Sequence, residues 1–149
     1  MLEKELKFIE DYIEFKDRKN LKVSKATVGW HLDHSLKVLN NVLVSLKESN
    51  SENFSPHFNL KRNIILMLGV FPRGKVKSPK RVLPPEIIEK EEIENQLNQV
   101  IKKLESINII EKEQFFTHPI FKDLNKKQTI RFLQIHTNHH LKIIKDILK

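Results

Sequence analysis

Apolar residues recur every three or four positions along most of the chain, the spacing of one face of an α-helix. The first such stretch, Leu2–Phe15, ends at the charged segment Lys16–Asn20. A second stretch runs from Ser24, a residue type that caps helices well, to about Glu48. Gly29 lies inside this second predicted helix, where glycine costs roughly 1 kcal/mol relative to alanine. We interpret it as a position that another backbone or a ligand approaches closely.

The middle of the chain predicts a shorter helix followed by a long irregular connection. Pro56 precedes apolar positions at helical spacing over His57–Leu68. The segment Phe71–Pro85 is rich in proline and contains the basic run Arg73–Arg81. A connection of this length is typical of a surface crossover or a binding loop, and the basic run is suited to hold an anionic group at the mouth of a pocket.

Two more helices are predicted in the second half. One begins after Pro85, a residue type favoured at the first helical position, and runs to about Ile107. Asn108–Leu124 is then a connector rich in aromatic residues, without the alternation of a strand or the signal of a hairpin turn. Asn125 caps the last helix, Lys126–Leu148, in a capping-box pattern.

Four main helices and one short helix predict an all-α fold, a four-helix bundle with a long crossover and a short extra helix. No linker-like stretch divides the chain, so we expect a single domain over residues 1–149. No apolar run approaches the roughly 18 residues of a membrane-spanning helix, and the N-terminus lacks a secretory hydrophobic region. We therefore expect a cytoplasmic protein that does not associate with membranes.

The composition limits the chemistry that the chain can perform. There is no cysteine, so any metal ion must be bound by histidine, aspartate or glutamate. The net charge of +8 leaves open a second hypothesis, a non-catalytic basic helical module that binds an acidic partner or nucleic acid. Lysine alternates with glutamate on the predicted helix faces, a pattern that does not favour nucleic acid as the partner.

Histidines provide the strongest functional signal, because three of the seven fall between positions 136 and 140. His136 and His140 are four residues apart and therefore share one helix face. That face is also apolar, with Leu133, Ile144 and Ile147 on it. A buried imidazole without a polar partner costs roughly 2–7 kcal/mol, and one metal ion satisfies two such rings.

A three-histidine metal site needs a third ligand from another helix. His31 is our first choice, because it lies at the edge of the apolar stripe of the second helix. His34, about 60° further toward the polar side of that helix, is the alternative. His34 and His139 are candidate proton carriers. Neutral imidazoles suit several divalent metals, among which we expect zinc or nickel.

At these residues the chain resembles the DinB-like, YfiT-like superfamily of metal-dependent enzymes. Ser24 followed by His31-Leu32 is similar to its first ligand region, and His136 and His140 are similar to its second and third ligands. A subfamily without an assigned reaction shares the His-Pro-x-Phe connector and the His-x-x-His-His run, which here are His118-Pro119-Ile120-Phe121 and His136-Thr137-Asn138-His139-His140.

The resemblance implies a four-helix bundle with a divalent metal bound by His31, His136 and His140. It also implies a metal-dependent enzyme, a thiol-dependent S-transferase or a hydrolase. Characterised relatives use bacillithiol, mycothiol or glutathione, so the expected partner is a low-molecular-weight thiol. The basic run Arg73–Arg81 is expected to hold its carboxylate. Such bundles can also pair, which makes a homodimer compatible with the resemblance.

Overall fold

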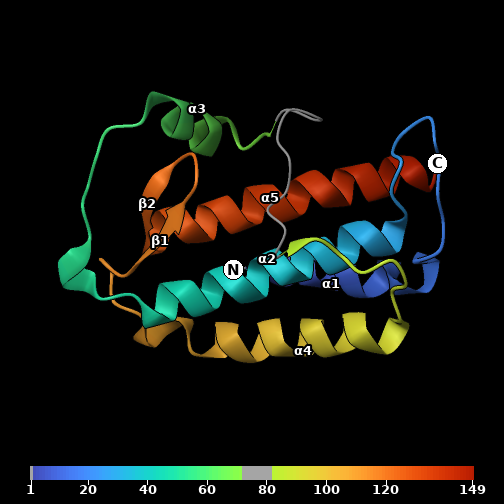
Figure 1. Ribbon diagram of the computed structural model, residues 1–149, viewed down its shortest axis with the longest axis horizontal. Helices are drawn as coiled ribbons and strands as arrows, with labels where there is room; N and C mark the ends of the chain where they lie inside the picture. Colours follow the sequence, from blue (N-terminus) through green and yellow to red (C-terminus); the bar gives the residue numbers. More distant parts are fainter. Residues whose placement is uncertain (1, 72–81) are drawn as a thin grey trace.

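Four helices lie side by side along the long axis of the computed structural model, which describes residues 2–71 and 82–149 (Figure 1). They are α1 (Glu3–Tyr12), α2 (Val28–Glu48), α4 (Lys90–Glu105) and α5 (Lys126–Ile147). The central helix is α2, which packs against α4 on one side and α5 on another. The chain runs along α2 in the direction opposite to α5, so the first half of α2 meets the second half of α5 (Figure 1).

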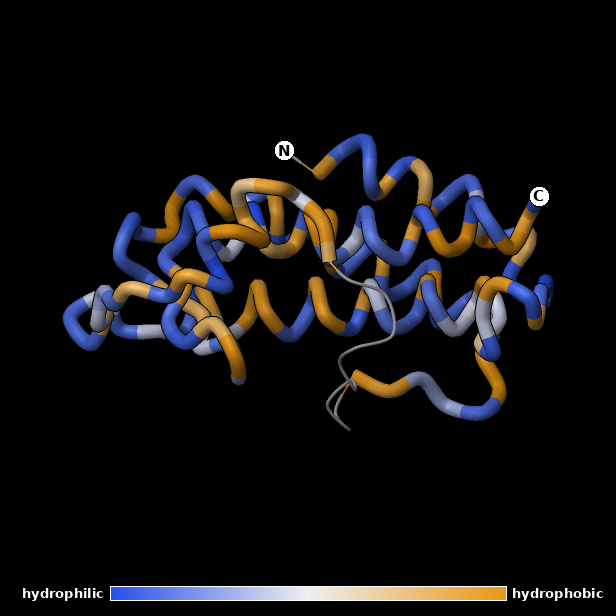
Figure 2. Tube along the Cα trace, turned by 90° about the horizontal axis from the view of Figure 1, so that it is seen from above, coloured by the Kyte–Doolittle hydropathy of each residue, from blue (hydrophilic) through white to orange (hydrophobic). Residues whose placement is uncertain are grey.

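Burial of α2 on more than one side follows from this central position. Its buried residues include polar positions as well as apolar ones: Val28, Gly29, His31, Leu32, Asp33, His34, Ser35, Leu36, Val38, Leu39, Asn40, Val42, Leu43 and Leu46. Apolar and polar residues alternate along the helical parts of the tube (Figure 2). In α4, for example, only Ile93, Gln96, Leu97 and Val100 are buried.

The fifth helix and a small sheet cover one end of α5 (Figure 1). The short helix α3 spans Leu60–Leu68, and strands β1 (Phe115–His118) and β2 (Lys122–Asn125) form an antiparallel hairpin. Phe116 pairs with Leu124 across the hairpin, and both side chains are buried. The expected all-α four-helix bundle is therefore wrong. The described part of the chain has five α-helices and a two-stranded sheet.

The hairpin carried no recognisable turn signal, which explains the error. Its turn has neither Asn-Gly nor Asp-Gly, and the position with positive φ is Lys122, at 60°. The backbone N–H groups of Ile120 and Phe121 each donate to Nδ1 of His118 at 3.1 Å, so an imidazole organises the turn. Strands of four residues are also too short to show alternation.

Several predicted helix ends are confirmed and others are displaced. Asn125 and Gln128 form the expected capping box at the start of α5. The predicted first helix is present as α1, followed by a 3₁₀ turn, Ile13–Phe15. The second helix, however, is capped by Thr27 and not by Ser24, since the Thr27 hydroxyl accepts from the N–H of Trp30 at 3.1 Å.

The third and fourth predicted helices begin later than expected. Helix α3 is capped by Asn59, which leaves His57 outside it. Helix α4 starts at Lys90, well after Pro85. The residue before it, Glu89, has extended backbone and makes no side-chain capping hydrogen bond.

Within the described residues, no helix is both long enough and apolar enough to cross a membrane. The basic run Arg73–Arg81 lies outside the described residues.

Gly29 is explained by a close backbone approach, one of the two interpretations offered for it. Its N–H donates to the carbonyl of Lys16 at 2.7 Å, and the N–H of Val28 donates to the carbonyl of Arg18 at 2.9 Å. A Cβ at position 29 would lie 3.0 Å from the Lys16 oxygen and 3.2 Å from the Lys16 Cβ. The segment after α1 thus satisfies the first N–H groups of α2.

We predict that Gly29→Ala lowers the free energy of unfolding by up to about 2 kcal/mol, because crowding costs about 1–3 kcal/mol and the gain in helix propensity is about 1 kcal/mol. Urea unfolding followed by circular dichroism measures the change. Asn41→Ala, at an exposed position of the same helix, is the control and should be neutral or slightly stabilising. A more stable Gly29→Ala variant would contradict the close approach.

Candidate metal centre

The antiparallel packing of α2 and α5 brings three histidines together. His34 comes from α2, and His136 and His140 come from adjacent turns of α5. One ring nitrogen from each lies within 4.8 Å of the others. The ring centroids are 4.7 to 5.3 Å apart. These three histidines are close enough to bind one metal ion.

His34 faces this cluster because α2 is packed between α4 and α5, so neighbouring residues of α2 are buried against different helices. The preceding residue, Asp33, faces α4 and accepts from Nε2 of Gln96 at 2.7 Å. Its other carboxylate oxygen lies 2.7 Å from Nζ of Lys37. Successive helical residues point about 100° apart, so His34 is turned away from α4 toward α5. The placement of His34 toward the polar side of the helix is therefore wrong, and its side chain is buried.

The Nδ1 of His34 is committed to a protein partner. It lies 2.8 Å from the backbone carbonyl of Val82, which can only accept, so Nδ1 carries the proton. The lone pair of a neutral His34 ring is then on Nε2. A ligand histidine commonly donates its second N–H to a carbonyl, which fixes its tautomer and ring orientation. Trp30 stacks on the same ring at 5.0 Å and limits its rotation.

His136 provides the most informative atom of the cluster. Its Nδ1 is shielded from solvent and makes no hydrogen bond within the described structure. Phe132 and Phe71 cover the ring, with centroids 5.8 and 6.3 Å away. A buried nitrogen without a partner is costly, and this one lies next to two other imidazoles with which it could share a metal ion.

Burial keeps the cluster uncharged. Desolvation, reinforced by the nearby rings of His34, His139 and His118, lowers the pKa of His136 to about 3. Desolvation also lowers the pKa of His140 well below its usual value, with His136 the largest further contribution. Burial likewise lowers the pKa of His34, although the bond to Val82 opposes it. At neutral pH the three rings are neutral, the form that binds metals.

His31, our first choice for the third ligand, has a different position. It is buried on α2 and contacts the cluster, but the group of convergent nitrogens contains His34 and not His31. Its Nδ1 lies 3.0 Å from Nδ1 of His140, and its Nε2 lies 3.1 Å from the hydroxyl of Ser24. The structure thus brings His31 beside the pair on α5 as a hydrogen-bonding neighbour of one of its members.

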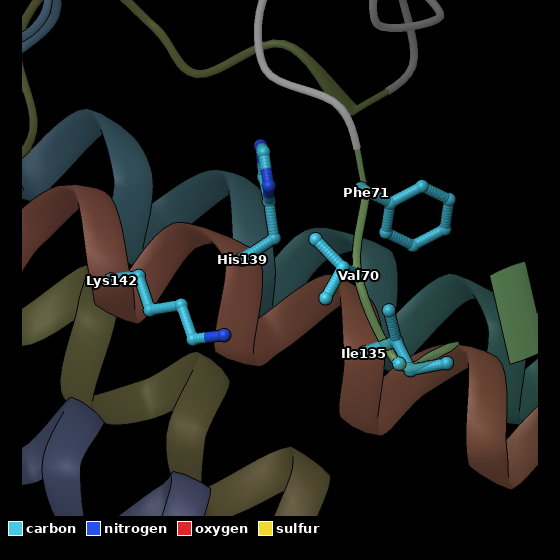
Figure 3. A pocket seen from close by; sticks show the side chains of 6 residues that line it. Val70, Phe71, Ile135, His139 and Lys142 are labelled. Atoms are coloured by element: carbon cyan, nitrogen blue, oxygen red, sulfur yellow. The ribbon is translucent and has the colours of Figure 1, made fainter. Parts of the chain in front are cut away.

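A small cavity of about 60 Å³ lies beside the cluster, between α5 and the chain that follows α3 (Figure 3). His139 projects at its edge, Lys142 reaches along it, and Phe71 extends from the segment that follows α3, on the side away from Lys142 (Figure 3). The His139 ring is 5.2 Å from that of His140. His139 is therefore at the rim of the cluster, the position from which a side chain can exchange protons with a small molecule.

Two contributors were not identified from the sequence. The Val82 carbonyl is 48 residues from His34 and has no residue-type signal. Ser24 was assigned to helix capping and, by resemblance, to the first ligand region, but its contact with His31 was not predicted: its hydroxyl binds the His31 ring and accepts from the N–H of Ala26 at 3.1 Å. A backbone carbonyl in a connecting segment and a serine before a helix are too common to be recognised without coordinates.

No protein-family model, curated protein or solved structure matches this chain.

Buried histidines with lowered pKa values predict acid sensitivity of the metal-free protein. Well above pH 6.5 the rings are neutral in both the folded and the unfolded state, so their protonation takes nothing from the free energy of unfolding. As the pH falls toward the folded-state values, about 4 for His118 and about 3 for His136, the unfolded chain binds more protons and stability is lost. Each such histidine contributes a slope of about 1.4 kcal/mol per pH unit.

We predict that His136→Gln reduces the number of protons taken up on unfolding by about one near pH 5, so the free energy of unfolding depends less steeply on pH. Urea unfolding in the presence of a chelator, repeated between pH 4 and 7.5, measures the slope. Asn41→Ala, which removes no titratable group, should keep the wild-type slope. A wild-type stability that does not change over this range would contradict the lowered pKa values.

Proposed function

We propose that the protein is a metal-dependent enzyme in which His34, His136 and His140 hold a divalent cation. The observation that carries this proposal is the buried Nδ1 of His136, which has no hydrogen-bond partner among residues 2–71 and 82–149 although it lies in a cluster of neutral imidazoles. His34 thereby takes the role first considered for His31. The DinB-like resemblance, which implies His31 as the first ligand, supports the same type of metal chemistry with His136 and His140.

The donor set fits such a cation. Three neutral nitrogen ligands leave a coordination position open, as in catalytic zinc sites. The bond from His34 to Val82 orients one ligand in the manner of known metal sites. Imidazole ligands suit zinc and nickel, which we propose as the metals. A bound divalent cation would act as a Lewis acid and lower the pKa of a thiol or water molecule.

The surrounding residues would bind and orient the substrate. Phe71, Val70 and Ile135 give the adjoining cavity an apolar wall, and Lys142 supplies a cation at its edge. His139 is placed to accept or return a proton at the rim. A small molecule with a thiol and a carboxylate matches this arrangement, so a thiol-dependent S-transfer is our preferred reaction and hydrolysis is the alternative.

We predict that the protein, purified without a histidine tag, stripped with a chelator and reloaded with Zn²⁺, retains one equivalent of metal after dialysis. The double variant His136→Ala/His140→Ala should retain far less, because two of three ligands are gone. Elemental analysis by mass spectrometry measures both. His57→Ala, which removes an imidazole outside the cluster, is the control. Equal metal content in wild type and double variant would rule out the site.

We also predict that thiols bind the metal directly. Protein loaded with Co²⁺ and then given glutathione or bacillithiol should develop an ultraviolet charge-transfer band, because a thiolate bound to cobalt produces one. The methyl thioether of the same thiol is the control and should produce none. Absence of the band with every thiol tested would exclude thiol-dependent transfer and leave hydrolysis as the reaction.

A further inference from the structure

A chain of two hydrogen bonds leads from His140 toward the surface. His140 Nδ1 and His31 Nδ1 are 3.0 Å apart, and His31 Nε2 and the Ser24 hydroxyl oxygen are 3.1 Å apart. His31 and His140 are 4% and 8% exposed, so water does not readily replace these partners. Ser24 is only partly buried. Both nitrogens of His31 are therefore engaged, one toward the cluster and one away from it.

The direction of these bonds determines which nitrogen of His140 has a free lone pair. Each neutral imidazole has one N–H and one acceptor nitrogen. If His140 Nδ1 donates to His31 Nδ1, then His31 Nε2 donates to Ser24, and Nε2 of His140 is free to bind a metal. In the reverse direction Nε2 of His140 carries the proton and cannot be a ligand.

We propose that His31 is a positioning residue that holds His140 as the Nδ1–H tautomer and presents its Nε2 to the metal. This inference rests on the proposed metal site. It gives the two histidines of α2 separate roles, with His34 a ligand held by Val82 and His31 the partner of a ligand. The Ser24 hydroxyl completes the arrangement by accepting from His31, while the N–H of Ala26 donates to the same oxygen at 3.1 Å.

The competing role for His31 is direct metal ligation. A cation on Nδ1 of His140 would lie next to Nδ1 of His31, and both rings would then be ligands. Loss of a ligand changes the coordination number, whereas loss of a positioning partner weakens binding and leaves the ligand set intact. The two roles therefore differ in a spectroscopic signature and not only in affinity.

The first test is direct observation of the tautomer. Long-range ¹H–¹⁵N correlation spectra of the metal-free, ¹⁵N-labelled protein at pH 7.5 distinguish a protonated Nδ1 from a protonated Nε2. We expect His140 to carry its proton on Nδ1 and His31 on Nε2. A proton on Nε2 of His140 would overturn the inference. This measurement needs no metal, so it decides the tautomer even if the proposed metal site fails.

The second test compares variants in metal affinity. His31→Leu removes the acceptor and should weaken Zn²⁺ binding, measured by competition with a chromophoric chelator, about 10- to 100-fold. His31→Gln keeps an acceptor oxygen and should recover most of the affinity. At saturating Co²⁺, the visible spectrum of His31→Leu should match wild type in position and intensity, whereas that of His34→Ala should not.

Two serines provide a matched control, because both contact His31. Ser24 binds its ring, while the hydroxyl of Ser35 donates to its backbone carbonyl at 2.7 Å. Ser24→Ala should weaken Zn²⁺ binding, and Ser35→Ala should leave the affinity unchanged. Wild-type affinity in His31→Leu would overturn the positioning role, and a changed Co²⁺ spectrum would make His31 a ligand. Failure of wild type to bind either metal would overturn the proposed function.

Discussion

The contact between α2 and α5 removes four imidazoles from water, and their need for polar partners governs the architecture around them. An unpartnered polar group in such a place costs roughly 2–7 kcal/mol. His34 meets this need through the Val82 carbonyl, and His31 and His140 meet part of it through each other. In the part of the chain that the structure describes, Nδ1 of His136 has no such partner. This atom therefore lies unsatisfied beside the rings of His34 and His140, in a cluster that could hold a metal ion.

The surrounding elements hold this contact in register. On the far side of α2, the buried Asp33 binds Gln96 of α4 and pairs with Lys37, which fixes the rotation of α2 about its axis. At its N-terminus, the carbonyls of Lys16 and Arg18 bind the first N–H groups of α2. The hairpin and Phe71 then close the aromatic wall around His136, because Phe121 and Phe71 stack at 6.2 Å. Apart from Phe71, which covers the His136 ring, these residues do not contact the histidine cluster, yet their contacts determine where its side chains point.

Burial gives these histidines chemical properties that exposed ones lack. Desolvation keeps His136 and His140 neutral well below physiological pH, so protons would not compete with a metal for their lone pairs. The cost is acid sensitivity of the metal-free fold, which a bound cation would offset by mass action. Polar side chains are meanwhile placed at the rim, where His139 and Lys142 adjoin a small cavity with an apolar wall. Two histidines of the cluster and half of the cavity lining thus come from neighbouring residues of α5.

Local sequence determined the helices, because periodic apolar positions and caps such as Asn125 act within a few residues of one another. It also determined that His136 and His140 share a face, since a spacing of four fixes their relation in any helix. It did not reveal the hairpin, whose turn depends on an imidazole acceptor, or the position of α2 between two neighbours. That position decided that His34 joins the pair on α5 while His31 binds one member of it. Which way a side chain points in a helix buried on several sides depends on what surrounds the helix, and only the tertiary structure contains that information.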